Sequence, residues 1–547
     1  MPANRRLLSL TTAALALALA VATIAGGQRA AIATSGTKAT PARGSDCTLD
    51  PAAPKRQLRA EWIASVVNID WPSRPGLTAD QQKAELIGWY DEAVARGLNA
   101  VIVQVRPTAD AFWPSPVEPW SKYLTGTQGQ DPGYDPLAFA VREAHRRNLE
   151  FHAWFNPYRV SMDTNRDALV PTHPARQHPD WVVPYGGKLY YNPGIPAVRK
   201  LVEDAIMDAV DNYDIDAVHF DDYFYPYPVG GQAFPDDDTF AQYSDGYTDK
   251  ADWRRHNIDL LISELSDRIH QAKPWVTFGV SPFAVWRNKA TDPAGSDTTA
   301  GAQTYDDLYA DTRRWVREEW IDYIAPQVYW NIGFTPADYA KLVPWWSEQV
   351  AGTDVQLYIG QATYKVGTST QDPAWSDPNE MTKHLFFNRD YPQVDGDIYF
   401  SAKDVRANRL QHMDIVQRDH YQHPALIPVT AGVPGKAPKA PKHVVADPSS
   451  AGVVVSWQGD GTSYAVYRFD GAHPHPTRCD FADASHLVAT VRGASGSTDE
   501  WTDTTTGAAA ATYYVTSLDR AHRESHPSGG ARPRCWLLAA ASCTNGP

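Results

Sequence analysis

Two adjacent aspartates at the end of a short apolar run are the residues of this chain that most directly suggest chemistry. Residues 215–222 read IDAVHFDD, a pattern typical of a buried strand. Successive side chains of a strand point to opposite faces, so a helix-facing Val218 places His219 and Asp221 on the other face. Asp222 then follows just beyond the strand. A buried carboxylate is costly unless it is paired or used, so the two aspartates predict a catalytic or binding site.

Polar residues recur at the inward-facing positions of other apolar runs. The same parity argument turns the following side chains inward: Gln104, Arg106, His152, Asn156, Ser281, Gln327 and Tyr329. A single residue of this kind more often completes a hydrogen bond than binds a ligand. Together with the run that carries His219 and Asp221, they occupy five runs, and this coincidence indicates a solvated end that binds a ligand. The expected substrate contacts among these strands are Arg106, His152, Asn156, His219, Gln327 and Tyr329.

Hydrolysis of a glycosidic bond is the chemistry that such a site would best suit. It needs one carboxyl group that protonates the leaving oxygen and a second that acts as nucleophile or base. Asp221 is the candidate nucleophile or base. The acid stays open between Asp222 and Asp110, which follows the run 99–106, and Glu118 lies further along the same loop. The last four apolar runs of this region end without an obvious carboxylate.

The elements that must position these residues form a repeating pattern. Strand candidates cover 58–67, 99–106, 149–156, 215–222, 276–282, 321–329, 355–361 and 396–401. Helix candidates cover 79–97, 136–147, 196–212, 254–272, 304–319, 336–349, 379–389 and 404–416. Such a series predicts an α/β fold, a (β/α)8 or TIM barrel, over residues 58–430. The longest connections follow strands, which places them at the C-terminal end, where active sites of such barrels form.

The start of the chain is typical of a secretory signal peptide. Arg5 and Arg6 precede an apolar stretch over 7–25, and an A-x-A cleavage site ends at Ala33. The paired arginines resemble a twin-arginine export signal. An uncleaved membrane anchor is the alternative. We expect a signal peptide over 1–33, a secreted or envelope-associated product, and no membrane span after cleavage.

The remaining segments suggest a spacer, a linker and a second folded module. Residues 34–57 and 431–442 are rich in small residues and proline and predict a spacer and a linker. Alternating strands follow in 443–547, and the runs VSW, YAVYR and YYVT there resemble a fibronectin type III β-sandwich with a C-terminal tail. A spacer or adhesion role suits this module better than a catalytic one.

The cysteines and the net charge indicate which disulfide can form and which classes of partner are excluded. An exported chain permits a disulfide, and the clustering of cysteines near the C-terminus predicts a bridge from Cys479 to Cys535 or Cys543. The formal net charge of −14 argues against nucleic acid or an anionic membrane as the main partner. The chain contains 19 Trp and 27 Tyr, and rings of this kind stack on sugar faces when they are exposed. No pattern suggests a zinc site.

Several short motifs follow one another through the barrel region. They are WIA at 62–64, NIDWP at 68–72, QVRP at 104–107, PWS at 119–121, LTG at 124–126, PGYDP at 132–136, HAWFNPYR at 152–159 and HFDDYFYP at 219–226. In this order they resemble the glycosyl-hydrolase-like family ten of bacterial envelope proteins. Glu61 departs from the pattern, because an apolar residue is expected between Ala60 and Trp62.

The resemblance implies a barrel glycosidase, and some members of that family act on peptidoglycan strands, particularly those stripped of stem peptides. The motif positions carried over are Arg106, Asp110, His152, Asn156, Arg159, His219, Asp221, Asp222, Gln327 and Tyr329. This adds Arg159 to the expected substrate contacts. The resemblance does not identify the general acid.

We therefore expect an exported glycoside hydrolase that acts as a monomer on a polysaccharide such as a cell-wall glycan, without a metal or cofactor. One alternative is a carbohydrate-binding protein whose barrel has lost catalysis. Another is a metal-dependent hydrolase that uses His152, His219 and Asp221, although paired strand-end histidines are missing.

Overall fold

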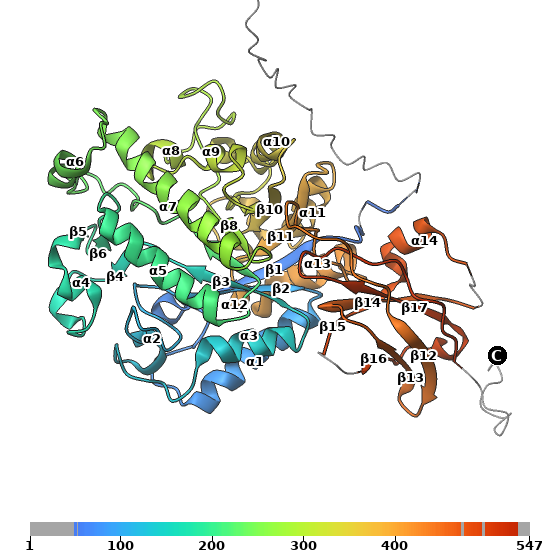
Figure 1. Cartoon of the computed structure of the whole chain (residues 1–547). Coiled ribbons are helices and arrows are strands. Elements are labelled where there is room, and N and C mark those ends of the chain that lie inside the picture. The colour runs from blue at the N-terminus through green and yellow to red at the C-terminus, as the bar shows by residue number, and fades with distance from the viewer. Residues whose placement is uncertain (1–46, 48, 52, 472–474, 495–497, 534–547) are drawn as a thin grey trace, which may run out of the picture. The chain divides into compact units, whose positions relative to one another are not determined.

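The computed structural model describes residues 47, 49–51, 53–471, 475–494 and 498–533 (Figure 1). The expected signal peptide and both Cys535 and Cys543 lie outside these residues. Within the described part of the chain, no helix is long and apolar enough to cross a membrane.

Eight parallel strands close into a barrel. They are β1 (Leu58–Ile63), β2 (Ala100–Arg106), β3 (Glu150–Phe155), β7 (Ala217–Phe220), β8 (Thr277–Val280), β9 (Tyr323–Ile324), β10 (Gln356–Gln361) and β11 (Val394–Tyr399). Each strand pairs with the next along this series, and β11 pairs with β1 to close the ring. The predicted (β/α)8 fold is confirmed, and every predicted strand overlaps an observed one.

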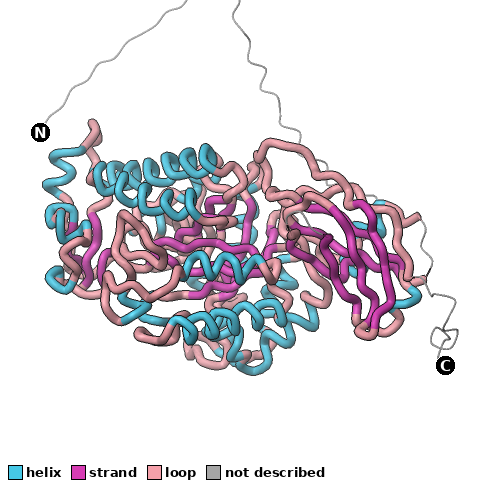
Figure 2. The backbone as a smooth tube through the Cα atoms, turned by 60° about the horizontal axis from the view of Figure 1, so that its bottom comes forward, coloured by secondary structure: helices cyan, strands magenta, loops and turns pink. Residues whose placement is uncertain are grey.

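Helices cover the outside of the strands, as the backbone drawing shows (Figure 2). They are α1 (Ala79–Ala95), α3 (Pro136–His145), α5 (Pro196–Asn212), α7 (Lys250–Ala272), α8 (Thr304–Asp307), α9 (Thr312–Arg317), α10 (Tyr339–Val350), α11 (Glu380–Asn388), α12 (Ala402–Ala407) and α13 (His412–His420). Side-chain caps begin several of them: Thr78 forms a capping box on α1, and Asp249 accepts from the backbone of α7.

Two of the predicted helices are each split in two. The span 304–319 contains α8 and α9, because Tyr309 adopts φ 52° between them. The span 404–416 contains the end of α12 and the start of α13, with Asn408 at φ 44° and Leu410 at φ 54° in between. Left-handed residues of this kind cannot continue a right-handed helix, and periodicity alone did not reveal them.

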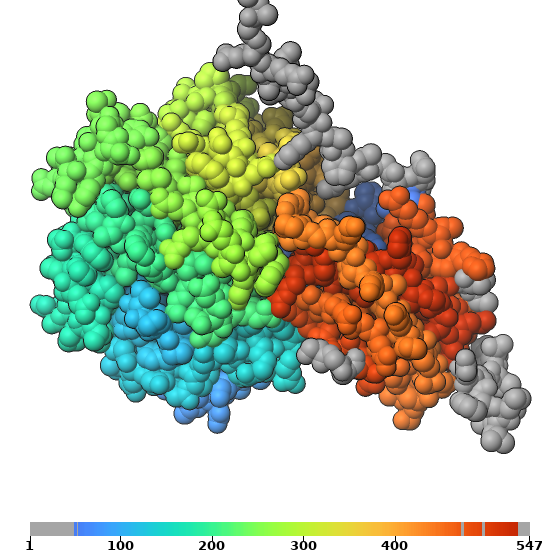
Figure 3. All heavy atoms as spheres, viewed as in Figure 1, coloured from blue at the N-terminus to red at the C-terminus, as the bar shows by residue number. Residues whose placement is uncertain are grey.

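The core has two layers that follow strand parity. Val218 and Phe220 pack between the strands and the helices, whereas Trp62 and Tyr323 belong to a separate cluster inside the barrel. The predicted facing of the β7 side chains is therefore confirmed. Glu61 points into the outer layer, where burial raises its pKa well above the ordinary range. Figure 3 shows the outer surface of the barrel region, coloured from blue to yellow along the sequence, from the same side as Figure 1.

Further small elements lie in the loops that follow strands. They are α2 (Lys122–Thr125), β4 (Arg159–Ser161), α4 (Pro174–Gln177), β5 (Val182–Tyr185), β6 (Lys188–Tyr191) and α6 (Asp237–Tyr243). The strands β4, β6 and β5 form a small sheet in the loop after β3. Its β5–β6 hairpin turns through Gly186 and Gly187, whose positive φ values of 56° and 76° favour glycine. This sheet fixes Arg159.

The C-terminal module consists of two three-stranded antiparallel sheets and a short helix. Its elements are β12 (Lys442–Ser449), β13 (Gly452–Gln458), β14 (Ser463–Phe469), α14 (Arg478–Ala482), β15 (Leu487–Arg492), β16 (Thr498–Asp503) and β17 (Thr512–Leu518). Trp457 is buried in the core that the two sheets share. The Tyr513 hydroxyl donates to Asp503 Oδ2 over 2.8 Å. The relationship to fibronectin type III domains stays a prediction.

The barrel and the module belong to one compact unit. Cys479 of the module forms a disulfide with Cys47, so the predicted bridge to Cys535 or Cys543 is wrong. Sequence spacing favoured partners near the C-terminus, but the fold brings the start of the described chain to α14 instead. Leu426, at the end of the barrel region, packs in the hydrophobic cluster of the module.

Candidate active site

Asp221 and Asp222 lie at the C-terminal end of β7, where Asp221 is 6% exposed and Asp222 is 7% exposed. The Asn156 side chain, just beyond β3, donates from Nδ2 to Asp221 Oδ2 over 2.6 Å. The backbone N–H of Tyr223 donates to the other oxygen of Asp221 over 3.2 Å. A carboxylate with two donors is held in one orientation.

A chain of amide groups explains why Asn156 presents its donor to Asp221. The oxygen of the Gln104 side chain accepts from the backbone N–H groups of Ser65 and Val66, at 2.9 and 2.8 Å. Gln104 therefore turns its amino group outward and donates to Asn156 Oδ1 over 2.5 Å. Asn156 is left with its own amino group facing Asp221. The relay connects the ends of β1, β2, β3 and β7.

Asp222 contacts a different set of partners. The Tyr227 hydroxyl donates to Asp222 Oδ2, and the Gln327 side chain donates to the same carboxylate. Gln327 is held in turn by a 2.9 Å bond from its Nε2 to the Ser281 carbonyl. Asp221 thus faces the β3 side of the barrel, and Asp222 faces the ends of β8 and β9.

Burial and mutual repulsion govern the charge of the pair. Burial and the charge of Asp222 raise the pKa of Asp221, and the Arg159 charge lowers it, with the net result that this pKa is about 6. Burial also raises the pKa of Asp222, against the hydrogen bonds from Tyr227 and Gln327. Two carboxyl groups coupled in this way lose their protons as a pair. A carboxyl group with a raised pKa holds its proton closer to neutral pH, as general acid–base chemistry requires.

Arg159 supplies positive charge beside the pair. It comes from β4, donates from Nε to the Pro107 carbonyl over 3.0 Å, and its guanidinium lies 5.1 Å from the centre of the Tyr223 ring. Its charge lowers the pKa of both Asp221 and Asp222. The structure thus places Arg159 beside Asp221 and Asp222, as the sequence analysis expected for a residue of the site.

Partly exposed aromatic rings surround the pair and contact one another. The rings are Tyr223, Tyr227, Phe283, Tyr329, Trp330, Tyr364 and Phe400. Tyr329 is close enough to the carboxyl groups that both of them help to hold its pKa well above the ordinary range, after burial and Tyr364. Flat rings around a buried carboxyl pair suit a ligand that has apolar faces and hydroxyl edges.

Arg106 is not placed to contact a substrate, which corrects that expectation. Its guanidinium binds both oxygens of Glu118, at 2.7 and 2.5 Å, and both side chains are 0% exposed. It also donates to the carbonyls of Asn156 and Pro157. The Arg106 side chain does point into the barrel as parity predicts, but its charge is neutralised by the buried ion pair with Glu118. Arg106 is a positioning residue for Asn156.

The two histidines lie deeper in the barrel, away from the pair, which also corrects the sequence expectation. His152 bonds the Tyr323 hydroxyl over 3.0 Å and Glu150 over 3.2 Å, near the N-terminal end of β3. His219 accepts from Trp62 Nε1 over 3.0 Å, and burial holds its pKa well below the ordinary range. Both rings fill the barrel interior with their hydrogen bonds satisfied, so neither is free for a ligand.

Asp110 is likewise separate from the pair. Its hydrogen bonds come from Thr108, Ser121 and Gln128, all in its own loop. Burial raises its pKa to about 7. The Asp110 carboxyl group stabilises the loop after β2. Because its hydrogen bonds keep it in this loop, it is no longer a candidate for the general acid.

Sequence reasoning missed Tyr227 and Lys365 at this site. Both follow strands in loops, where strand parity assigns no direction. The aromatic motif HFDDYFYP, which ends one residue before Tyr227, was the nearest available signal for it. For Lys365, no signal in the sequence separates it from the surface lysines.

A metal site built from His152, His219 and Asp221 is not supported by their placement. They lie at different depths of the barrel with different partners, as described above. In the described part of the chain, no group of three or more His, Cys, Asp or Glu side chains is arranged to hold a metal ion.

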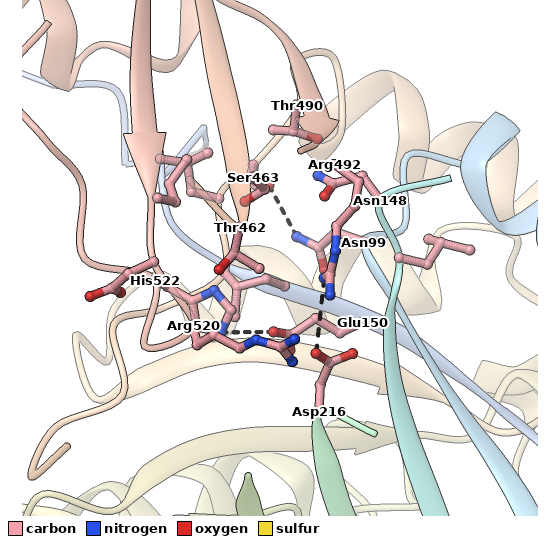
Figure 4. A pocket seen from close by; sticks show the side chains of 16 residues that line it. Asn99, Asn148, Glu150, Asp216, Thr462, Ser463, Thr490, Arg492, Arg520 and His522 are labelled. Carbon is pink, nitrogen blue, oxygen red and sulfur yellow. Dashed lines mark hydrogen bonds and ion pairs between the residues drawn. The ribbon is translucent and has the colours of Figure 1, made fainter. Parts of the chain in front are cut away.

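A cavity of about 40 Å³ lies at the opposite end of the barrel, against the module (Figure 4). Glu150 and Asp216, at the N-terminal ends of β3 and β7, line it together with Arg492, Arg520 and His522 of the module. His522 bonds Glu150 over 2.7 Å, and Arg520 pairs with Asp214 over 2.5 Å. Ion pairs fill this region, and the module therefore contacts the end of the barrel that lacks Asp221.

Comparison with known proteins gives relatives over most of the chain. Glycosyl hydrolase YngK of Bacillus subtilis (strain 168) is 49% identical over 483 residues, which cover 86% of this chain and 92% of YngK. Glycosyl hydrolase DigH of Escherichia coli (strain K12) is 41% identical over 381 residues, covering 66% of this chain and 86% of DigH. The PgaB (BpsB) glycoside hydrolase domain from Bordetella bronchiseptica superposes with a TM-score of 0.43 at 13% identity, covering 66% of this chain and 99% of that domain.

The sequence model of the family described as "Glycosyl hydrolase-like 10" matches residues 57–377, more than half of the chain. The match includes β7 and the loops that carry Asn156, Arg159, Asp221 and Asp222. The chain therefore belongs to the glycosyl hydrolase-like 10 family.

Proposed function

We propose that this protein is an exported glycoside hydrolase that cleaves a polysaccharide, namely the glycan strands of bacterial cell-wall peptidoglycan. The observation that carries the proposal is the buried pair of Asp221 and Asp222 at the C-terminal end of the barrel, with Asn156 and Arg159 beside it. Family membership and the names of two relatives support a glycosidase. Export and the cell-wall substrate rest on the N-terminal sequence and on the motif resemblance.

In the proposed reaction the two aspartates divide the work. Asp222 gives its proton to the glycosidic oxygen as the bond to the anomeric carbon breaks. Asp221, ionised and oriented by Asn156, either attacks the anomeric carbon itself or removes a proton from the water that attacks this carbon. The two carboxyl groups face different sides of the site, Asp221 toward β3 and Asp222 toward β8 and β9, so each can contact a different atom of the reacting sugars.

The surrounding groups support binding of a sugar chain. The rings of Tyr223 and Tyr329 offer faces for pyranose stacking beside the pair. The Arg159 charge favours an ionised aspartate and lies ready for hydroxyl or anionic groups of the glycan.

The direct test is product analysis by mass spectrometry after incubation of the protein with peptidoglycan glycan strands, chitin oligosaccharides and cellulose oligosaccharides. Shortened oligosaccharides are expected from the first. Asp237 is exposed and pairs with Lys250 rather than with the aspartate pair, and Asp237→Asn is a matched control that should leave the products unchanged. Binding of strands without any cleavage would instead favour a carbohydrate-binding protein.

A further inference from the structure

A cleft of about 970 Å³ lies between the barrel and the C-terminal module, separate from the aspartate pair. Its barrel side is formed by α3 and by the segment after α5, and its module side by the turn between β13 and β14, the end of β15 and Arg520 after β17. Because α3 and α5 lead into the N-terminal ends of barrel strands, the cleft lies away from Asp221. It borders the cavity of Figure 4, with which it shares Thr462, Arg492 and Arg520.

Positive charge predominates among the described residues that line the cleft. Four arginines face two aspartates there, although the whole chain carries a formal net charge of −14. The arginines are Arg142 and Arg146 of α3 and Arg492 and Arg520 of the module, and the aspartates are Asp214 and Asp460. Arg520 donates two hydrogen bonds to Asp214, at 2.5 and 3.0 Å, and Arg492 lies 3.7 Å from the same carboxylate. These contacts fix the two module arginines against the barrel.

Arg142 and Arg146 are the most exposed of the four, with 60% and 70% of their side chains accessible to solvent. Both pair with the buried carboxylate of Glu143, at 3.7 and 3.2 Å, and Glu143 also binds Arg147 over 3.1 Å. One carboxylate therefore serves three guanidinium groups. Ion pairs of exposed side chains are weak, and residues four apart on a helix lie side by side. Arg142 and Arg146 can therefore turn together toward an anion in the cleft.

The module side of the cleft contains little side-chain bulk, because Gly459, Gly461 and Gly493 line it. A Cβ atom at Gly493 would lie 2.4 Å from the Gly461 carbonyl oxygen, and one at Gly461 would lie 2.8 Å from the Ser463 carbonyl oxygen. The close approach of the two loops thus requires glycine. The resulting wall of backbone suits a slender chain, whereas the flat surface of a bilayer cannot enter a cleft.

The side chains of the cleft narrow the class of anion. Each cation of the described lining that is charged at every ordinary pH is an arginine, whose planar fork matches pairs of phosphate oxygens. The bases of a single-stranded nucleic acid need exposed rings on which to stack. Tyr213 is the one Phe, Tyr or Trp in the described lining, and its hydroxyl is bound to Asp135 over 2.7 Å. The cleft therefore suits a phosphate chain without bases.

We propose that this cleft binds a linear polyol phosphate polymer, a chain of phosphodiesters joined by short polyalcohols. The inference goes beyond the proposed function and does not depend on it, because the cleft and Asp221 lie at opposite ends of the barrel strands. The bound polymer holds the protein in place and leaves the C-terminal end of the barrel open to a glycan. Binding weakens as salt is added, since exposed charges make the contacts.

An imperfect fit between barrel and module is the alternative origin of the cleft. In that case the arginines only support the ion pairs around the interface, and anions meet them as they would meet any positive surface. Two properties separate the alternatives. A binding site depends on where the charges lie rather than on how many there are, and it needs the open space of the cleft.

The test measures the binding of a synthetic glycerol phosphate oligomer to the full chain by calorimetry. Arg142→Gln combined with Arg146→Gln removes two charges from the cleft. The matched control combines Arg418→Gln with Lys341→Gln, which removes the same charge from two ion pairs that do not line the cleft. Ala138→Trp keeps every charge and fills the cleft with a bulky side chain. A glutamate oligomer, single-stranded DNA and phosphatidylglycerol vesicles serve as comparison ligands at equal charge.

The double variant on α3 and Ala138→Trp should each weaken binding of the glycerol phosphate oligomer about tenfold or more, and the matched control should stay within about twofold of the parent protein. Melting curves establish that each variant is folded. A comparison ligand that binds as tightly as the oligomer would overturn the assigned class of ligand. No binding of the oligomer, an equal loss in the matched control, or undiminished binding by Ala138→Trp would overturn the site.

Discussion

Asn156 Nδ2 lies 2.6 Å from Asp221 Oδ2, and this bond connects the ends of β3 and β7. It gives the carboxylate a fixed orientation, because the other end of the Asn156 amide is already occupied by Gln104. The contact also opposes the effect of burial on the Asp221 pKa. Orientation and charge at the centre of the site thus depend on one amide.

Replacement of Asn156 with alanine should therefore shift the acid limb of the pH–rate profile. Without this donor the pKa of Asp221 rises above its present value of about 6, so a higher pH is needed to ionise it. We also expect turnover at the optimum to fall about tenfold or more. Initial rates between pH 4 and 9 measure both effects. An acid limb that stays in place would contradict a role for Asn156 in tuning Asp221.

The Arg106–Glu118 pair should matter for stability rather than for substrate contact. Arg106→Gln leaves Glu118 charged and buried without its partner, and breaking such a pair costs about 3–5 kcal/mol. Urea unfolding measures the loss. Removing both charges with Arg106→Met and Glu118→Leu together should recover much of the stability. If the single variant unfolds like the parent protein, the pair has no structural role.

Asp110 predicts a stability that depends on pH. Its pKa is about 7 in the folded protein and about 4 in an unfolded chain. The folded state therefore holds the Asp110 proton more tightly than the unfolded chain does. As a consequence, the free energy of unfolding decreases as the pH rises from about 4 through 7. In Asp110→Asn this contribution is absent, so the melting temperature should fall less between pH 5 and pH 8 than in the parent. Parallel melting curves across that range would count against it.

Removal of the module should lower stability and leave the site intact. A chain that ends at residue 430 exposes Leu426 and loses the Arg520–Asp214 pair, both at the end of the barrel opposite Asp221. The melting temperature should fall, whereas glycan cleavage by the folded fraction should stay within a few-fold. A folded barrel without activity would place the module in the active site.

Much of the fold could be predicted from the sequence, because strand parity and the alternation of apolar runs with helical patterns follow directly from burial. The barrel and the facing of His219 and Asp221 are examples. Parity assigns a direction but no depth along the barrel axis. His152 was therefore taken for a ligand contact, although it lies near the N-terminal end of β3.

Other features depend on contacts that the order of strands and helices along the chain does not reveal. The Cys47–Cys479 disulfide joins residues 432 positions apart, which spacing in the sequence cannot indicate. Arg106 gained a buried partner from a loop, and Tyr227 reached Asp222 from another. In each case the tertiary arrangement of loops decided the outcome, and loops lack the periodicity on which sequence prediction rests.

The measurement that tests the central claim most directly is the turnover of Asp221→Asn on peptidoglycan glycan strands, with binding measured in parallel. The substitution keeps size and most hydrogen bonding but removes the charge that would act on the anomeric carbon or on water. Turnover should fall about a thousandfold or more, while the affinity for the strand stays within a few-fold. Turnover within a few-fold of the parent protein would show that the end of β7 is not the catalytic centre.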